Sequence, residues 1–148
     1  MPVNQQGGAF DPSRDVGLSG ALTVAGQILS NVAATGGVGY GTGAGGAVTQ
    51  ITSKSTAVTL NALCGTITTH AANLANATAV GFTVNNAYVA ANDVVVLSFK
   101  SGNTANSYTL TVDAVASGSF KISIYNFTGG TLGDTLVISF AVIKAVAA

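Results

Sequence analysis

Charged side chains are scarce in this chain: they make up 7% of its 148 residues, and glutamate is absent. Five basic and five acidic side chains balance to a net charge of zero at pH 7. Binding to nucleic acid or to an anionic membrane needs clustered Lys and Arg, so the composition argues against both partners. Glu, Lys and Arg are also the long helix-forming residues, so we expect no exposed helices. So little charge favours association with other protein surfaces.

Cysteine is almost as rare, and tryptophan is absent. Cys64 is the single cysteine, which excludes an intrachain disulfide and a metal site built from several thiolates. The start, MPVNQQGGAFDPSRD, lacks the basic and then apolar regions of a signal peptide. The end, VISFAVIKAVAA, is broken by Lys144 and falls well short of the ~20 apolar residues of a membrane helix. We therefore expect a soluble, unprocessed chain, with no glycosylation at the sequons Asn76-Ala77-Thr78 and Asn126-Phe127-Thr128.

The C-terminal half, Ala79 to Lys144, carries the clearest pattern in the chain. Short β-branched and aromatic runs alternate there with clusters of Gly, Asn, Ser and Asp, which is typical of strands joined by turns. Within most runs the apolar residues occupy alternate positions, as in Val80, Phe82 and Val84. Such alternation predicts strands with one buried and one exposed face, packed as antiparallel sheets around a core.

We predict an all-β fold, an antiparallel β-sandwich with an extended N-terminal arm. A jelly roll is preferred on strand count, and an immunoglobulin-like sandwich is the alternative. No helical pattern separates the runs, so alternating βα units are excluded. The predicted strands are Val48–Thr52, Ala57–Leu60, Gly65–His70, Ala79–Asn85, Val94–Lys100, Ser107–Ala114, Ser119–Phe127 and Leu136–Lys144.

The first third of the chain has a different composition. We predict that residues 1–46 form an arm and a Gly-rich connector, with short strands near 20–30, and that residues 47–148 form the sandwich. A short amphipathic helix over Gln27 to Ala33 is a weaker alternative to those strands. The start is either a disordered tail or an arm that docks on a neighbour. Burial of its few apolar side chains would stabilise it by less than the entropy cost of ordering its backbone. We therefore expect contacts with other chains to order it. The predicted partner interface comprises Val3, Phe10, Arg14, Val16, Leu18, Leu22, Val24 and Ile28.

Two motifs could bind a ligand or carry out catalysis, but their spacing or sequence context does not fit. Gly41 to Gly46 matches the letters of a dinucleotide-binding turn, but a strand-like segment follows where that turn needs a helix. Cys64 and His70 could suggest a thiol nucleophile and its base. On one extended segment they lie ~20 Å apart, beyond hydrogen-bond reach. We expect Cys64 to be a small, buried apolar group and His70 to end a strand.

The carboxylates and aromatic rings also form no recognisable site. Asp93 and Asp134 occur in turn-like contexts, whereas Asp113 lies on the outward positions of its strand. The tyrosines are scattered, with Tyr108 on core positions and Tyr125 facing outward, so a sugar-binding platform is a weaker alternative. We predict no catalytic, cofactor-binding or metal-binding residues, no cofactor, and no enzymatic activity.

One resemblance points to a class of protein. The segments GAGGAVTQITSKSTAVTLN from Gly43, CGTIT from Cys64, FTVNN from Phe82 and the final ISFAVIKA occur in an order and spacing that resembles a known β domain. That domain recurs in virion proteins of tailed bacteriophages, in small head proteins and at the ends of fibre-like proteins. The resemblance covers roughly Gly43 to Ala145, and ALTVAGQILSNVAA before it is similar to fibre-type repeats.

The resemblance implies a structural component of a bacteriophage virion. In one version the chain is a capsid cement or decoration protein on the outside of the shell, bridging major capsid subunits and forming a dimer or trimer with itself. In the alternative it is a subunit of a short trimeric head or tail fibre or spike involved in host attachment. The chain has one possible repeat unit and no long shaft, which favours the cement protein. We therefore expect it at the capsid surface of the virion, with the major capsid protein as its partner.

Overall fold

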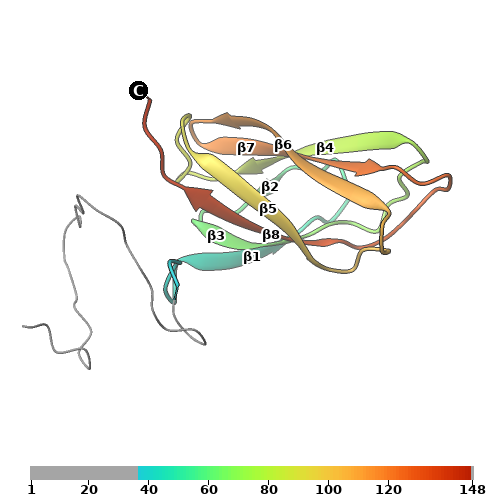
Figure 1. Cartoon of the computed structure of the whole chain (residues 1–148), viewed down its shortest axis with the longest axis horizontal. Helices are drawn as coiled ribbons and strands as arrows, with labels where there is room; N and C mark the ends of the chain where they lie inside the picture. The colour runs from blue at the N-terminus through green and yellow to red at the C-terminus, as the bar shows by residue number, and fades with distance from the viewer. Residues whose placement is uncertain (1–36, 148) are drawn as a thin grey trace, which may run out of the picture. The chain divides into compact units, whose positions relative to one another are not determined.

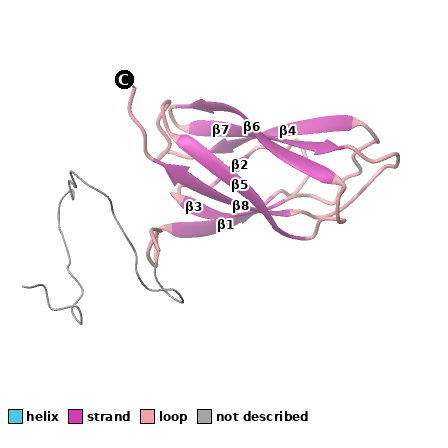
Figure 2. Ribbon diagram, in the orientation of Figure 1, coloured by secondary structure: helices cyan, strands magenta, loops and turns pink. Residues whose placement is uncertain are grey.

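The structure, a computed structural model, describes residues 37–147 of the chain. Gly39–Ala148 form one compact unit of eight strands in two four-stranded sheets that pack against each other (Figures 1 and 2). The strands are β1 (Gly45–Thr49), β2 (Val58–Thr59), β3 (Cys64–Thr68), β4 (Thr78–Asn85), β5 (Val94–Ser101), β6 (Tyr108–Ala116), β7 (Ser119–Asn126) and β8 (Val137–Ile143). Within residues 37–147, no helix could cross a membrane. The predicted all-β sandwich is confirmed.

The two sheets share one underlying order. Sheet A runs β1-β3-β8-β5, and sheet B runs β2-β4-β7-β6. Four pairs of strands, β1–β2, β3–β4, β5–β6 and β7–β8, each place one strand in sheet A and the other in sheet B. These pairs occur in the same order across both sheets. The sandwich is therefore a four-stranded ribbon folded across its middle (Figure 1). The connectors that cross from sheet to sheet at this fold are residues 50–57, 69–77, 102–107 and 127–136.

The prediction of purely antiparallel sheets is wrong at two edges. β1 runs parallel to β3, and β2 runs parallel to β4, so both sheets are mixed. The reason is that β1–β2 and β3–β4 both cross from sheet A to sheet B, and residues 60–63 carry the chain back between them. Alternation of side chains reveals a strand's two faces but not its direction. A jelly roll is built from antiparallel Greek keys, which contain no such parallel pairs. The strand order therefore does not confirm the predicted jelly roll.

All eight predicted strands are present, and the largest error is at β1. That strand begins at Gly45, three residues before the predicted start at Val48. The prediction places Gly45 and Gly46 in the Gly-rich connector instead. Gly46 pairs with Gly65 of β3, and a Cβ on Gly65 would lie 2.4 Å from the Gly46 carbonyl oxygen. The glycines therefore allow two backbones to approach closely.

The core lies between the sheets and is built from the alternating positions predicted by the sequence. Ile122 and Ile124 of β7 and Ile138 and Val142 of β8 have no exposed surface. Phe120 of β7 and Phe140 of β8 meet from opposite sheets, with ring centroids 5.4 Å apart. Burying each such side chain stabilises the fold by ~1.5–3 kcal/mol.

This core predicts a difference between two phenylalanines. Phe120 is 2% exposed, whereas Phe127, just after β7, is 47% exposed. We expect Phe120→Ala to lower the free energy of unfolding by ~3–5 kcal/mol, because it removes contacts and leaves a cavity. The same change at Phe127 should cost much less. Urea denaturation measures both values, and equal losses at the two positions would contradict the packing described here.

Candidate functional site

The predicted partner interface lies outside the described residues. Val3, Phe10, Arg14, Val16, Leu18, Leu22, Val24 and Ile28 all precede residue 37, so their role stays a prediction. The structure does describe the point at which that segment joins the sandwich. The two ends of the sandwich carry the polar networks and are named the Tyr40 end and the Lys54 end, after the residue that is central to each.

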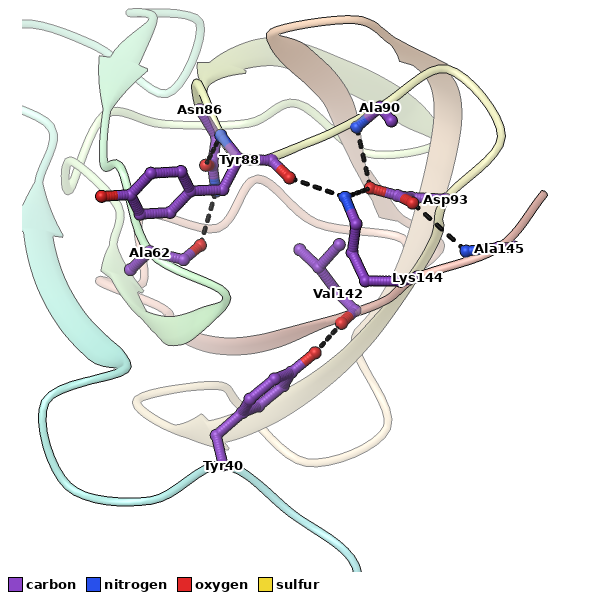
Figure 3. A network of polar contacts seen from close by, with 9 residues as sticks. All are labelled: Tyr40, Ala62, Asn86, Tyr88, Ala90, Asp93, Val142, Lys144 and Ala145. Carbon is purple, nitrogen blue, oxygen red and sulfur yellow. Dashed lines mark hydrogen bonds and ion pairs between the residues drawn. The ribbon is translucent and has the colours of Figure 1, made fainter. Parts of the chain in front are cut away.

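At the Tyr40 end, the segment that leads into β1 is fixed to β8. The Tyr40 hydroxyl donates a hydrogen bond to the carbonyl oxygen of Val142 (Figure 3). The backbone N–H of Ala44 donates to the Gly41 carbonyl, which closes a turn, and Leu63 N–H donates to the Ala44 carbonyl. The glycine-rich residues thus form a turn and then a strand, without the helix that a dinucleotide site requires. Pulling on the chain at residue 40 would act directly on a central strand of sheet A.

The same end contains the Asp93 network (Figure 3). Lys144, just after β8, donates from Nζ to Asp93 Oδ2 at 2.5 Å and to the Tyr88 carbonyl at 2.9 Å. Asp93 also accepts backbone hydrogen bonds from Ala90 at 2.8 Å and Ala145 at 3.3 Å. The network therefore ties the loop between β4 and β5 to the chain that follows β8.

Electrostatics explain why Asp93 is tolerated in this position. Its side chain has no exposed surface, whereas that of Lys144 is 55% exposed. The hydrogen bond from Ala90, followed by that from Lys144, lowers the pKa of the Asp93 carboxyl below 3.8. A buried carboxylate is stable when donors satisfy it, and here they hold it in the charged form.

At the Lys54 end a lysine is buried between connectors. Lys54 is 3% exposed, and its Nζ donates to the carbonyl oxygens of His70 and Asp134, each at 2.5 Å. Gln50, also buried, donates to the carbonyls of Lys54 and Thr56 and accepts from the His70 N–H at 3.2 Å. Burial lowers the pKa of Lys54, and the nearby Asp134 carboxylate partly offsets this effect. These contacts join three of the four connectors at this end.

Tyr108 lies beside this group. It is 6% exposed, as its core position predicts, and burial raises the pKa of its phenol. Among residues 37–147 its hydroxyl has no hydrogen-bond partner of good geometry, although it lies close enough to Asp134 for the two groups to interact. The Asp134 carboxylate instead accepts the backbone N–H of Thr104 at 2.7 Å. Hydrogen bonding from the side chain of Thr104, followed by that from its backbone, lowers the pKa of Asp134.

The structure separates the residues that could have suggested chemistry. Cys64 begins β3 and His70 follows its end, so the two lie at opposite ends of one strand, as predicted. The prediction that Cys64 is buried is wrong, because the residue is half-buried at the start of the strand. Asp93 and Asp134 lie at opposite ends of the sandwich, and Asp113 is exposed on β6, where Thr111 and Ser123 donate to it. In the part of the chain that the structure describes, no three His, Cys, Asp or Glu side chains gather as a metal site would need.

Prediction from the sequence missed two residues that hold the connectors, Lys54 and Asn126. Lys54 stands between two serines, which is typical of an exposed turn, and nothing local indicates that it is buried. Asn126, in one of the sequons, is fully buried and donates to the carbonyls of Leu74, Ala75 and Gly130. The Gly129-Gly130 turn close behind it is the signal that could have identified Asn126 as a turn residue.

Acid titration tests the Asp93 network. Folding lowers the pKa of Asp93, so its contribution to stability is complete above 3.8 and is lost as the pH falls through the folded value. We expect Asp93→Asn to be less stable than the wild type at neutral pH and to lose less further stability below pH 3.8. Urea denaturation over a series of pH values measures this. Parallel acid profiles for the two proteins would contradict the role given to Asp93.

Replacement of Lys54 tests the Lys54 end. Lys54→Met leaves the carbonyls of His70 and Asp134 without a donor, and we expect a loss of ~1–3 kcal/mol in the free energy of unfolding. Because folding lowers the pKa of Lys54, wild-type stability should also rise relative to the variant as the pH increases toward 10.5. Lys100→Met, at an exposed position on β5, is the matched control and should change stability by less than about 0.5 kcal/mol. A control as damaging as Lys54→Met would refute the assignment.

Comparison with protein-family models, with curated proteins and with solved structures found no match for this chain.

Proposed function

We propose that this protein is a bacteriophage capsid cement, or decoration, protein. In this proposal it binds the outside of the shell and bridges major capsid subunits, so that the particle resists the pressure of its packaged genome. The observation that carries the proposal is the two-part organisation of the chain. A compact sandwich, whose sequence resembles a β domain of phage virion proteins, follows an N-terminal third whose apolar residues are too few to pack a core.

The proposed mechanism is mechanical. The apolar side chains of the arm, such as Val3, Phe10, Val16 and Leu18, bury themselves in the seams between capsid subunits. The sandwich, whose β1 and β2 run parallel to their neighbours, supplies a rigid body on the capsid surface. The partners are the major capsid protein and further copies of the chain, as a dimer or trimer, without nucleic acid, membrane or cofactor.

The attachment of the arm supports this mechanism. Load on the arm would reach the sandwich at Tyr40, whose hydroxyl is bonded to the Val142 carbonyl. Val142 belongs to β8, which pairs with both β3 and β5 in the middle of sheet A. The load would therefore be shared by three strands and their core rather than by an edge, so the sandwich resists unravelling from the end that is pulled.

Heat stability of the particle tests the proposal. Shells that lack this protein should release DNA on mild heating, and addition of the full chain should restore their stability. Phe10→Asp should fail to restore it, because a charge cannot enter an apolar seam without a large desolvation cost. Phe127→Asp places the same change on an exposed position of the sandwich and is the matched control.

Two outcomes would count against the proposal. Particles without the protein could be as heat-stable as complete ones, in which case it does not reinforce the shell. Alternatively, intact shells without it could fail to adsorb to cells, which is the result expected of the fibre or spike subunit.

A further inference from the structure

β5 is an edge strand with a free side. In sheet A it pairs with β8 along its length, with an irregularity between Phe99 and Ser101, and it has no second neighbour in the sheet. Across residues 37–147, no backbone hydrogen bond from Val94–Ser101 goes to a turn or loop. Within the described part of the chain, the outer N–H and C=O groups of β5 are therefore available to another strand.

The outward face of β5 is apolar at Val94 and Val96 and becomes polar at Ser98 and Lys100. Val94 is 52% exposed, Val96 is 49% exposed and Ile143 of β8 is 54% exposed. Val94 and Ile143 lie directly opposite each other in the sheet, and Val96 lies opposite Ala141. We call Val94, Val96 and Ile143 the β5 patch. The nearest charges, on Asp93 and Lys144, neutralise each other in the Asp93 network. The patch therefore combines exposed aliphatic surface with free backbone groups.

The other edges lack this combination. β1, the other edge of sheet A, exposes Gly45, Ala47 and Thr49. In sheet B, β2 has two residues, and β6 exposes Thr109 and Thr111. The pairing of β6 with β7 is also interrupted between Val112 and Ala114, where Asp113 is exposed. An irregularity and a charge protect an edge against pairing. β5 has both as well, an irregularity between Phe99 and Ser101 and the exposed Lys100, but they lie near its end, and the stretch from Val94 to Ser98 has neither.

We propose that the β5 edge is the contact between two copies of this chain. In the dimer, β5 of each copy pairs antiparallel with β5 of the other about a twofold axis, so that sheet A continues from one copy into the next. The axis keeps both outward faces on the same side, so the two β5 patches meet. This inference does not depend on the proposed function.

The chemistry of the surface indicates a second copy as the occupant. A twofold contact is self-complementary, and here it places aliphatic side chains against aliphatic side chains. Pairing β5 with β1 of another copy would instead set Val94 and Val96 against Gly45, Ala47 and Thr49, which offer little apolar area. The net charge of zero adds no repulsion between identical copies.

Sedimentation equilibrium of the full chain over a range of concentrations tests the proposal. We expect the wild type to form a dimer. Val96→Lys should weaken association by roughly a hundredfold or more, because it brings two like charges together at the contact. Thr111→Lys is the matched control, since it places the same charge on the exposed face of the other long edge strand, and it should leave the dimer intact.

Amide hydrogen exchange provides the second measurement and does not depend on a variant. The β5 amides that point away from β8 should gain protection as the concentration rises, whereas β6 amides should not change. A wild type that stays monomeric, a dimer that survives Val96→Lys, or an oligomer in which β5 gains no protection would each overturn the proposal. The first 36 residues are unchanged in both variants, so association through them would survive Val96→Lys and be recognised as such.

Discussion

The packing of β7 against β8 across the sandwich is the contact on which the rest of the molecule depends. Phe120 and Phe140 meet there, and the buried positions of both strands fill the space between the sheets. β8 also accepts the hydrogen bond from Tyr40, and Lys144 directly after it holds the loop between β4 and β5. One central strand therefore connects the core, Tyr40 in the segment before β1, and the Asp93 network.

At each end of the sandwich a lysine holds the connectors together, but the two lysines have different kinds of partner. Each end must hold connectors that have few apolar side chains, and each uses one lysine to do so. Lys144 is half-exposed and pairs with a buried carboxylate, whereas Lys54 is buried and donates to backbone carbonyls. With so few charges in the chain, these two have structural partners, and the outer faces of the sheets carry mainly Thr, Ser and small apolar residues. Such surfaces are suited to contact with other protein.

Alternating positions such as Ile138, Phe140 and Val142 sufficed to predict the strands and the core, because side-chain period is a local property. The direction of β1 and the burial of Lys54 were not predictable in this way. Lys54 meets a carbonyl 80 residues away in the sequence, so its environment exists only once the connectors have come together. The Asp93–Lys144 pair, 51 residues apart, was missed for the same reason. The eight interface residues predicted in the arm precede the described part of the chain, and their role remains a prediction.

In the proposed function, the sandwich is a rigid support and the N-terminal segment recognises the shell. The most direct test is the position of density for this chain in an intact phage particle, determined by electron cryomicroscopy. The account predicts sandwiches on the outer surface of the shell, with residues 1–36 running along seams between major capsid subunits. Density for the chain confined to a tail or fibre, with none on the shell, would contradict it.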